Sequence, residues 1–462
     1  MVNTGYGDLI TTEISLFLCT FSVQQDFDQP LSSEDWDRLY RYTWAIKNAH
    51  FSYWKMPVPY SSFRWISPSP IAFSTLASPQ YSSGDTCIFP ALRSWRGEYQ
   101  MSKFDVSSLS LFVSRQIERV ELSLSSSFDE PTHGVAPLLL ELLADHPIAL
   151  RHFELACDDN VQNIMPGLER ISTLPYLEHF VFNSFPISHQ VLLNLGRLRH
   201  LNYLFVEQIS FPSEAPRLSQ NAFPQLKTFL ISNLPDTTAL LLYDSGFSPK
   251  SLQSIFAGTT NPPNFNSFGH LITSSGDQMH NIECSGWRIR LRFEDLQILT
   301  PLANLQSLDI SGVTYLELDD NELEEVIRHL RHLRKWRTLV SRLPGSRHMP
   351  TLLSIGNFLR HCPKLRSLTL TMNATVLPTG SYPTHPIFPP LTDSFELDVG
   401  LSILKDPEAV VQWLNPWLKG FGSIGFRWNW ASPFAVEWRG VYEFLKFFDH
   451  TLHGDLRGSA AV

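Results

Sequence analysis

One short apolar pattern returns along most of the chain, and its spacing constrains the fold more than any other feature of the sequence. Written L-x-x-L-x-L with apolar substitutes, the pattern begins at Leu92, Ile117, Leu150, Leu177, Leu201, Leu226, Leu252, Met279, Leu305, Leu333 and Leu365. From Ile117 to Leu305, successive copies start 24 to 33 residues apart. One hydrophobic core normally holds no more than roughly 250 to 300 residues, so a chain of 462 residues with this pattern is interpreted as a repeat array.

Alternating apolar residues at the end of each copy predict a short strand with one buried face. The stretches between copies leave room for helices, which we expect over 137–146, 188–195, 321–333, 352–361 and from Asp406 onward. Strands joined by such long connections run parallel. The spacing fits leucine-rich repeats, with roughly 20 to 29 residues each, better than all-helical arrays of about 40 to 47. The predicted fold is therefore α/β, a right-handed leucine-rich-repeat solenoid with irregular repeats, a curved parallel sheet and helices on its convex side. An all-helical solenoid is the alternative.

Changes in composition divide the chain around this array. We expect a helical segment over 1–55, a Pro- and Ser-rich loop over 56–88, the array over 89–372, a Pro-rich loop over 373–392 and a C-terminal repeat or cap unit over 393–462. Residues 258–278 are expected to form a further surface loop. Atypical ends are expected in such arrays because terminal repeats need a solvated outer face.

Composition excludes several classes of protein. A net charge of -9 lacks the basic excess that binding to nucleic acid requires. The five cysteines are far apart and form no C-x-x-C pair, which indicates neither disulfides nor zinc and fits the cytoplasm or the nucleus. The most apolar N-terminal run, 14–23, is shorter than the ~20 residues of a membrane span, so neither a membrane segment nor a signal peptide is expected.

Two motifs that could carry chemistry fit a structural interpretation better. Residues 420–425 read G-x-G-x-x-G but follow an expected helix, the reverse of the order in dinucleotide sites, and are interpreted as a flexible connector. His329 and His332 lie on one expected helical face, but the Arg and Lys side chains around them would repel a metal ion. That basic cluster could instead bind an anion or an importin. Signatures of hydrolases, zinc proteases and P-loops are absent from the sequence, so we expect no enzyme activity, cofactor or metal.

Five segments carry a family resemblance. They read PLSSEDWDRLYRY at 30–42, FPALRS at 89–94, LDDNEL at 318–323, HCPKLRSL at 361–368 and DPEAVVQWL at 406–414. They resemble segments of the F-box and leucine-rich-repeat proteins of mushroom-forming fungi. The resemblance implies that the repeats select a target protein, while an F-box docks on a Skp-type adaptor of a cullin ubiquitin ligase. Residues 1–29 are too short and too poor in leucine and proline for an F-box, so weak or no adaptor binding is expected. A target receptor and a stand-alone interaction scaffold remain as alternatives.

Side chains that alternate out of the core are expected to line the concave sheet and to bind the partner protein. Its centre should be apolar and aromatic, formed by His179, Val181, Tyr203, Phe205, Thr228, Leu230 and Phe256. Its polar rim should comprise Ser94, Arg96, Arg119, Glu121, His152 and Glu154 on one side, and Asn281, Glu283, Ser307, Asp309, Ser367 and Thr369 on the other. An apolar centre inside a polar rim is typical of protein interfaces, and Tyr203 and Phe205 are the expected anchors. Alternatively, the 258–278 loop folds back and buries this centre.

Overall fold

The computed structural model describes residues 47–52, 90–100, 113–125, 135–145, 149–157, 164–212, 216–219, 221–258, 265–285, 290–340, 349–378, 391–418, 421–429 and 432–448. The chain divides into two compact units. The first comprises residues 1–214 and 221–224, and the second comprises 215–220 and 225–462. The loop expected over 56–88 lies outside the described residues.

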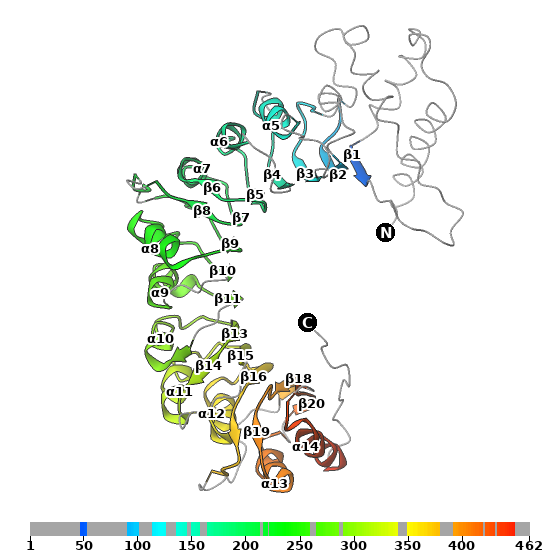
Figure 1. Cartoon of the computed structure of the whole chain (residues 1–462), viewed down its shortest axis with the longest axis vertical. Helices are drawn as coiled ribbons and strands as arrows, with labels where there is room; N and C mark the ends of the chain where they lie inside the picture. Colours follow the sequence, from blue (N-terminus) through cyan, green and yellow to red (C-terminus); the bar gives the residue numbers. More distant parts are fainter. Residues whose placement is uncertain are drawn as a thin grey trace, which may run out of the picture. The chain divides into compact units, whose positions relative to one another are not determined.

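The first unit contains a parallel sheet with one strand per repeat. Its described strands, in spatial order, are β1 (Asn48–Ser52), β2 (Ser94–Gln100), β3 (Arg119–Ser125), β4 (His152–Cys157), β5 (His179–Phe182) and β7 (Tyr203–Val206). The helices α5 (Val135–Asp145), α6 (Met165–Ile171) and α7 (His189–Gly196) lie together on one side of this sheet (Figure 1). A separate pair of short parallel strands is formed by β6 (Ile187–Ser188) and β8 (Ile209–Ser210).

The second unit repeats this arrangement. Its parallel sheet runs through β9 (Thr228–Ile231), β10 (Ser254–Gly258), β11 (Asn281–Ser285), β13 (Ser307–Val313), β15 (Lys335–Val340), β16 (Ser367–Leu370), β18 (Leu391–Asp398) and β20 (Phe421–Arg427). The helical side comprises α8 (Asp236–Asp244), α9 (Phe265–Thr273), the 3₁₀ turn η3 (Gly276–Gln278), α10 (Phe293–Gln297), α11 (Asp320–Ile327), α12 (Leu352–His361), α13 (Pro407–Leu418) and α14 (Ala435–Phe448). Two further strand pairs are β12 (Arg290–Arg292) with β14 (Tyr315–Glu317), and β17 (Asn373–Ala374) with β19 (Ile403–Leu404).

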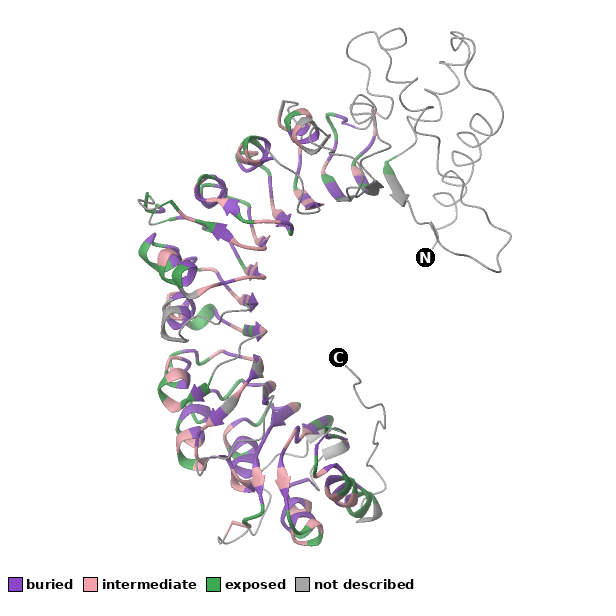
Figure 2. Cartoon of the chain, viewed as in Figure 1, coloured by how far each residue is buried: buried purple, intermediate pink, exposed green. Residues whose placement is uncertain are grey.

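The apolar pattern accounts for both cores. Each copy places its strand two residues after its first apolar residue, as β3 follows Ile117 and β16 follows Leu365. The first, fourth and sixth residues of a copy are buried between strands and helices, for example Leu150, Phe153 and Leu155 (Figure 2). Each repeat therefore completes its core only by stacking on its neighbours.

The strand pairing confirms the predicted fold class. All described pairs within the two sheets are parallel, and helices cover one side of each sheet. This is the leucine-rich-repeat architecture, so the all-helical alternative is wrong. Among the residues that the structure describes, no helix combines the length and the apolar character that crossing a bilayer requires.

Local side-chain caps fix several helix starts. Asp319 accepts hydrogen bonds from the backbone N–H groups of Asn321 and Glu322, at 2.9 and 2.8 Å, and Glu322 accepts one from the N–H of Asp319 at 2.9 Å. This capping box starts α11. Asp406 accepts from the N–H of Ala409 at 3.1 Å, as predicted for the helix that opens there.

Several expectations about local structure are wrong. Residues 48–52, expected within a helical segment over 1–55, form β1, and residues 1–46 and 53–55 of that segment lie outside the described residues. The expected loop 258–278 contains α9 and η3. The ends of the expected loop 373–392 belong to β17 and β18. The G-x-G-x-x-G stretch 420–425 lies largely within β20, so it is neither a connector nor a phosphate loop.

The helix expected over 321–333 is also shorter than predicted. It ends at Ile327, where a turn begins that leads toward β15. His329 and His332 therefore do not share a helical face. The basic residues of this stretch lie in the turn as well, and most of them are exposed.

Candidate protein-binding face

We call the side of each sheet that faces away from the helices its strand face. In β4 and β7 of the first unit, the first and third residues point to this face, while the second and fourth point into the core. Parallel pairing aligns equivalent residues, so His152 lies beside His179, and His179 beside Tyr203. Residues at the same position in successive repeats therefore form a continuous row of side chains across the strands.

The rings of His152, His179 and Tyr203 form a stacked row. The ring centroids of His152 and His179 are 5.0 Å apart with planes inclined by 26°. Those of His179 and Tyr203 are 4.9 Å apart and inclined by 16°. Stacking restricts the rotation of these rings within the protein itself.

A charged group borders this row. Glu121 is 9% exposed and forms ion pairs with Arg119 and with Arg96, the latter at 3.4 Å. The Nε2 atom of His152 lies 3.3 Å from Glu121 Oε1 and 3.7 Å from Glu154 Oε2. Polar and charged side chains therefore lie at these positions, and their charges largely neutralise one another.

The environment shifts the pKa values of His179 and Tyr203 in this row and of Glu154 beside it. Burial lowers the pKa of His179, and its electrostatic interaction with the neighbouring His152 lowers it further. Contact with His152 lowers the pKa of Glu154, against the opposing effect of partial burial. Burial raises the pKa of Tyr203, and the charge of Glu154 contributes further. At neutral pH the stacked row therefore presents a neutral His179 and a neutral Tyr203 beside an ionised Glu154.

Three of these residues have the chemistry of metal ligands. The ligand atoms of Glu121, His152 and Glu154 all lie within 4.8 Å of one another. Such a set could hold a zinc or manganese ion. However, Arg96 and Arg119 both pair with Glu121, and two cations at this distance oppose the binding of a third. The group acts more simply as the charged border of the stacked row.

The third strand position adds apolar surface. Val181 and Phe205 are aligned partners on β5 and β7. Phe205 is partly exposed, whereas Val181 is only 8% exposed and contributes little accessible area. The first-unit part of the predicted centre therefore consists mainly of His179, Tyr203 and Phe205.

The remaining residues of the predicted centre lie on the strand face of the second unit. Leu230 on β9 is aligned with Phe256 on β10, and Thr228 with Ser254. Thr228, Leu230 and Phe256 are all partly exposed. The 258–278 segment was expected to cover them if it folded back. Its described part instead adds α9 to the helical side, where Phe268 and Leu271 are buried (Figure 1).

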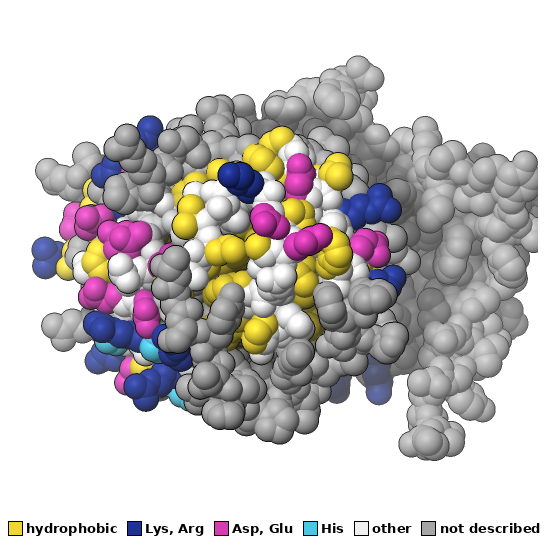
Figure 3. All heavy atoms as spheres, turned by 90° about the horizontal axis from the view of Figure 1, so that it is seen from below, with side chains coloured by type: hydrophobic (Ala, Val, Ile, Leu, Met, Phe, Trp, Pro, Cys, Tyr) yellow, Lys and Arg dark blue, Asp and Glu magenta, His cyan; other side chains and the backbone are white. Residues whose placement is uncertain are grey.

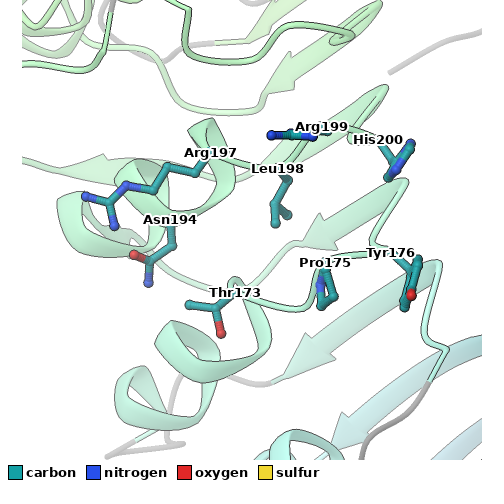
Figure 4. A pocket seen from close by; sticks show the side chains of 8 residues that line it. All are labelled: Thr173, Pro175, Tyr176, Asn194, Arg197, Leu198, Arg199 and His200. Carbon is teal, nitrogen blue, oxygen red and sulfur yellow. The ribbon is translucent and has the colours of Figure 1, made fainter.

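A hollow that the sequence did not indicate lies at the turns preceding β5 and β7 in the first unit. It is lined by Thr173, Pro175, Tyr176, Asn194, Arg197, Leu198, Arg199 and His200 (Figure 4). The Asn194 amide already donates to Glu169 O at 3.0 Å and Ser172 Oγ at 3.1 Å. The other polar side chains that line the hollow do not converge on one point, so the hollow lacks the geometry of a catalytic site.

Comparisons with known proteins add little to this picture. No protein-family model matches the chain, and no curated protein matches its sequence. Among solved structures, the chain is similar to an internalin from Listeria monocytogenes, with 11% identity and a TM-score of 0.41 over 96% of this chain and 94% of the internalin. A likeness of this degree carries no argument about partners, and the fold assignment rests on the strand pairing.

Proposed function

We propose that the chain binds another protein through its strand faces and has no catalytic role. The observation that carries this proposal is the stacked row of His152, His179 and Tyr203 beside the partly exposed Phe205. Rigid aromatic side chains supply large contact areas at low entropy cost and are enriched among the residues that dominate binding energy. Tyr203 and Phe205 are the proposed anchors, bordered by charges that fix the orientation of the partner. Thr228, Leu230 and Phe256 are proposed to contribute on the second strand face.

The test is partner capture by the purified full chain from an extract of its native host, followed by binding measurements with the captured protein. Phe205→Glu places a charge at the proposed anchor and should weaken binding by about 2 kcal/mol or more, roughly 30-fold. Leu240→Glu is the matched control, because Leu240 is 41% exposed on the helical side. It should leave binding unchanged. Equal binding by both variants, or unfolding by Phe205→Glu, would show that the anchor is misassigned.

Within this class, a target receptor of a cullin-type ubiquitin ligase is the more specific proposal. The resemblance of residues 30–42, 89–94, 318–323, 361–368 and 406–414 to F-box and leucine-rich-repeat proteins supports it. The cytoplasm or the nucleus is the compartment in which such a receptor would act. Purification from the native host should then recover a Skp-type adaptor and a cullin with the chain, whereas a stand-alone scaffold would recover neither.

The purified components provide a separate test. Binding of a Skp-type adaptor to the chain can be measured directly with the purified proteins. A complex of roughly micromolar affinity or tighter would strengthen the ligase proposal.

A further inference from the structure

Two turns of the first unit, which precede β5 and β7, form the walls of the hollow shown in Figure 4. One wall comprises residues 173–176 and the other residues 197–200. Asn194 ties them together, because its amide donates to the carbonyl of Glu169 and to Ser172 Oγ, just before the first wall. The hollow has a volume of about 510 Å³. This lies within the roughly 300 to 1,000 Å³ of typical ligand-binding pockets.

The charged side chains that line this hollow are all basic. Arg197, Arg199 and His200 are exposed, and no Asp or Glu is among the lining residues. Within the part of the chain that the structure describes, neither arginine forms an ion pair with a carboxylate. Glu178, close to the first wall in the sequence, is already bound by Arg151 at 2.9 Å. The two guanidinium groups are therefore accessible to an acidic ligand.

The middle of the hollow is apolar. Pro175 is exposed, Tyr176 is 56% exposed, and Leu198 is only 5% exposed and forms the floor. Figure 4 shows Arg197 toward one end of the hollow and Tyr176 toward the other, with Leu198 and Pro175 between them. The basic side chains thus border an apolar centre instead of surrounding a single point.

We propose that this hollow binds an acidic peptide segment of a partner protein, which places one apolar side chain over Leu198 and carboxylates beside Arg197 and Arg199. Arginine suits this ligand, because its planar guanidinium can bind a carboxylate through two parallel hydrogen bonds. A single phosphate is bound best by donors that point at one place, and the lining side chains do not converge in this way. A long nucleic acid would also be repelled by the net charge of -9.

The test uses a fluorescein-labelled peptide of about seven residues, with one leucine between glutamates, which spans roughly 23 Å when extended. Its binding to the full chain is measured by fluorescence anisotropy at about 0.05 M and 0.3 M salt. Arg197→Gln combined with Arg199→Gln should weaken binding at least about tenfold, and higher salt should weaken it as well. Tyr176→Ala removes apolar contact and should weaken binding at least about threefold.

The matched control removes the same charge from another basic surface. Lys and Arg side chains with His beside them gather on one side of the second unit (Figure 3). In that unit Arg331 and Arg334 are both exposed, so Arg331→Gln combined with Arg334→Gln changes the net charge equally and leaves the hollow intact. This control should change the affinity for the peptide less than about twofold.

Other outcomes count against the proposal. Equal losses in the two double variants, or no binding of the peptide at all, would overturn it, provided that circular dichroism shows the variants folded. Equally tight binding of a peptide with glutamine in place of leucine would show that charge alone attracts the peptide and that the hollow is not its site. Displacement of the peptide by an equal concentration of inorganic phosphate would overturn the choice of a carboxylate ligand. The inference goes beyond the strand-face proposal, because Phe205→Ala should leave peptide binding unchanged and the two proposals can fail separately.

Discussion

Leu204 and Phe205 are neighbours on β7, and together they test whether the strand face is surface or core. Leu204 is fully buried, whereas Phe205 is partly exposed on the opposite side of the sheet. Leu204→Ala removes a side chain from the core and leaves a cavity, which should cost about 2 to 5 kcal/mol of unfolding free energy. Phe205→Ala removes a larger side chain but creates no enclosed cavity, so the cost should be about 1 kcal/mol or less.

Urea unfolding of the full chain, followed by circular dichroism, measures both effects. The midpoint should fall clearly for Leu204→Ala with little change in slope, and only slightly for Phe205→Ala. Because the stability of a solenoid is largely local, hydrogen exchange of the β7 amides provides a second readout at the site of the change. An equal loss of stability for the two variants would refute the assignment of Phe205 to an accessible face.

Other predictions address packing and titration. Gly356→Ala should destabilise the protein by about 1 to 3 kcal/mol in thermal unfolding, because its Cβ would lie 2.7 Å from the Trp417 ring. At Gly440 an added Cβ would lie 3.8 Å from its nearest neighbour, Pro407, so Gly440→Ala should instead raise the stability of the protein by about 0.5 to 1 kcal/mol. A less stable Gly440→Ala and a more stable Gly356→Ala would contradict the packing of α12 against Trp417. Burial raises the pKa of Cys362 to about 12, so iodoacetamide at about pH 8 should modify it only after urea is added, as mass spectrometry would show. Because the pKa of His179 is lowered in the folded protein, the unfolded state binds the proton of this side chain more tightly. The free energy of unfolding is therefore unaffected by this group above its ordinary pKa of 6.5, and it decreases as the pH falls from 6.5 toward the lower pKa of the folded state. His179→Asn should therefore reduce the drop in Tm between about pH 7.5 and 5.5, and an unchanged drop would show that other groups cause it.

The period of the apolar pattern sufficed to predict the parallel sheet, because each copy supplies its own strand and its own core residues. Even the degraded copy at Leu333 places its strand, β15, at the expected offset, with Trp336 fully buried. The pattern failed where other signals competed with it. In α9 the buried Phe268, Leu271 and Ile272 have helical spacing, but the prolines, serines and glycines around them favoured a loop.

The candidate site was predictable as a set of positions, but not as a geometry. Alternation placed His179, Tyr203 and Phe205 on one face, and the structure agrees. The stacked row required the register of β4, β5 and β7, which brings residues 24 and 27 positions apart into contact. Alternation also assigned Val181 to the surface, whereas its neighbours bury it. Burial depends on the sizes of side chains on adjacent repeats, which a single strand does not reveal.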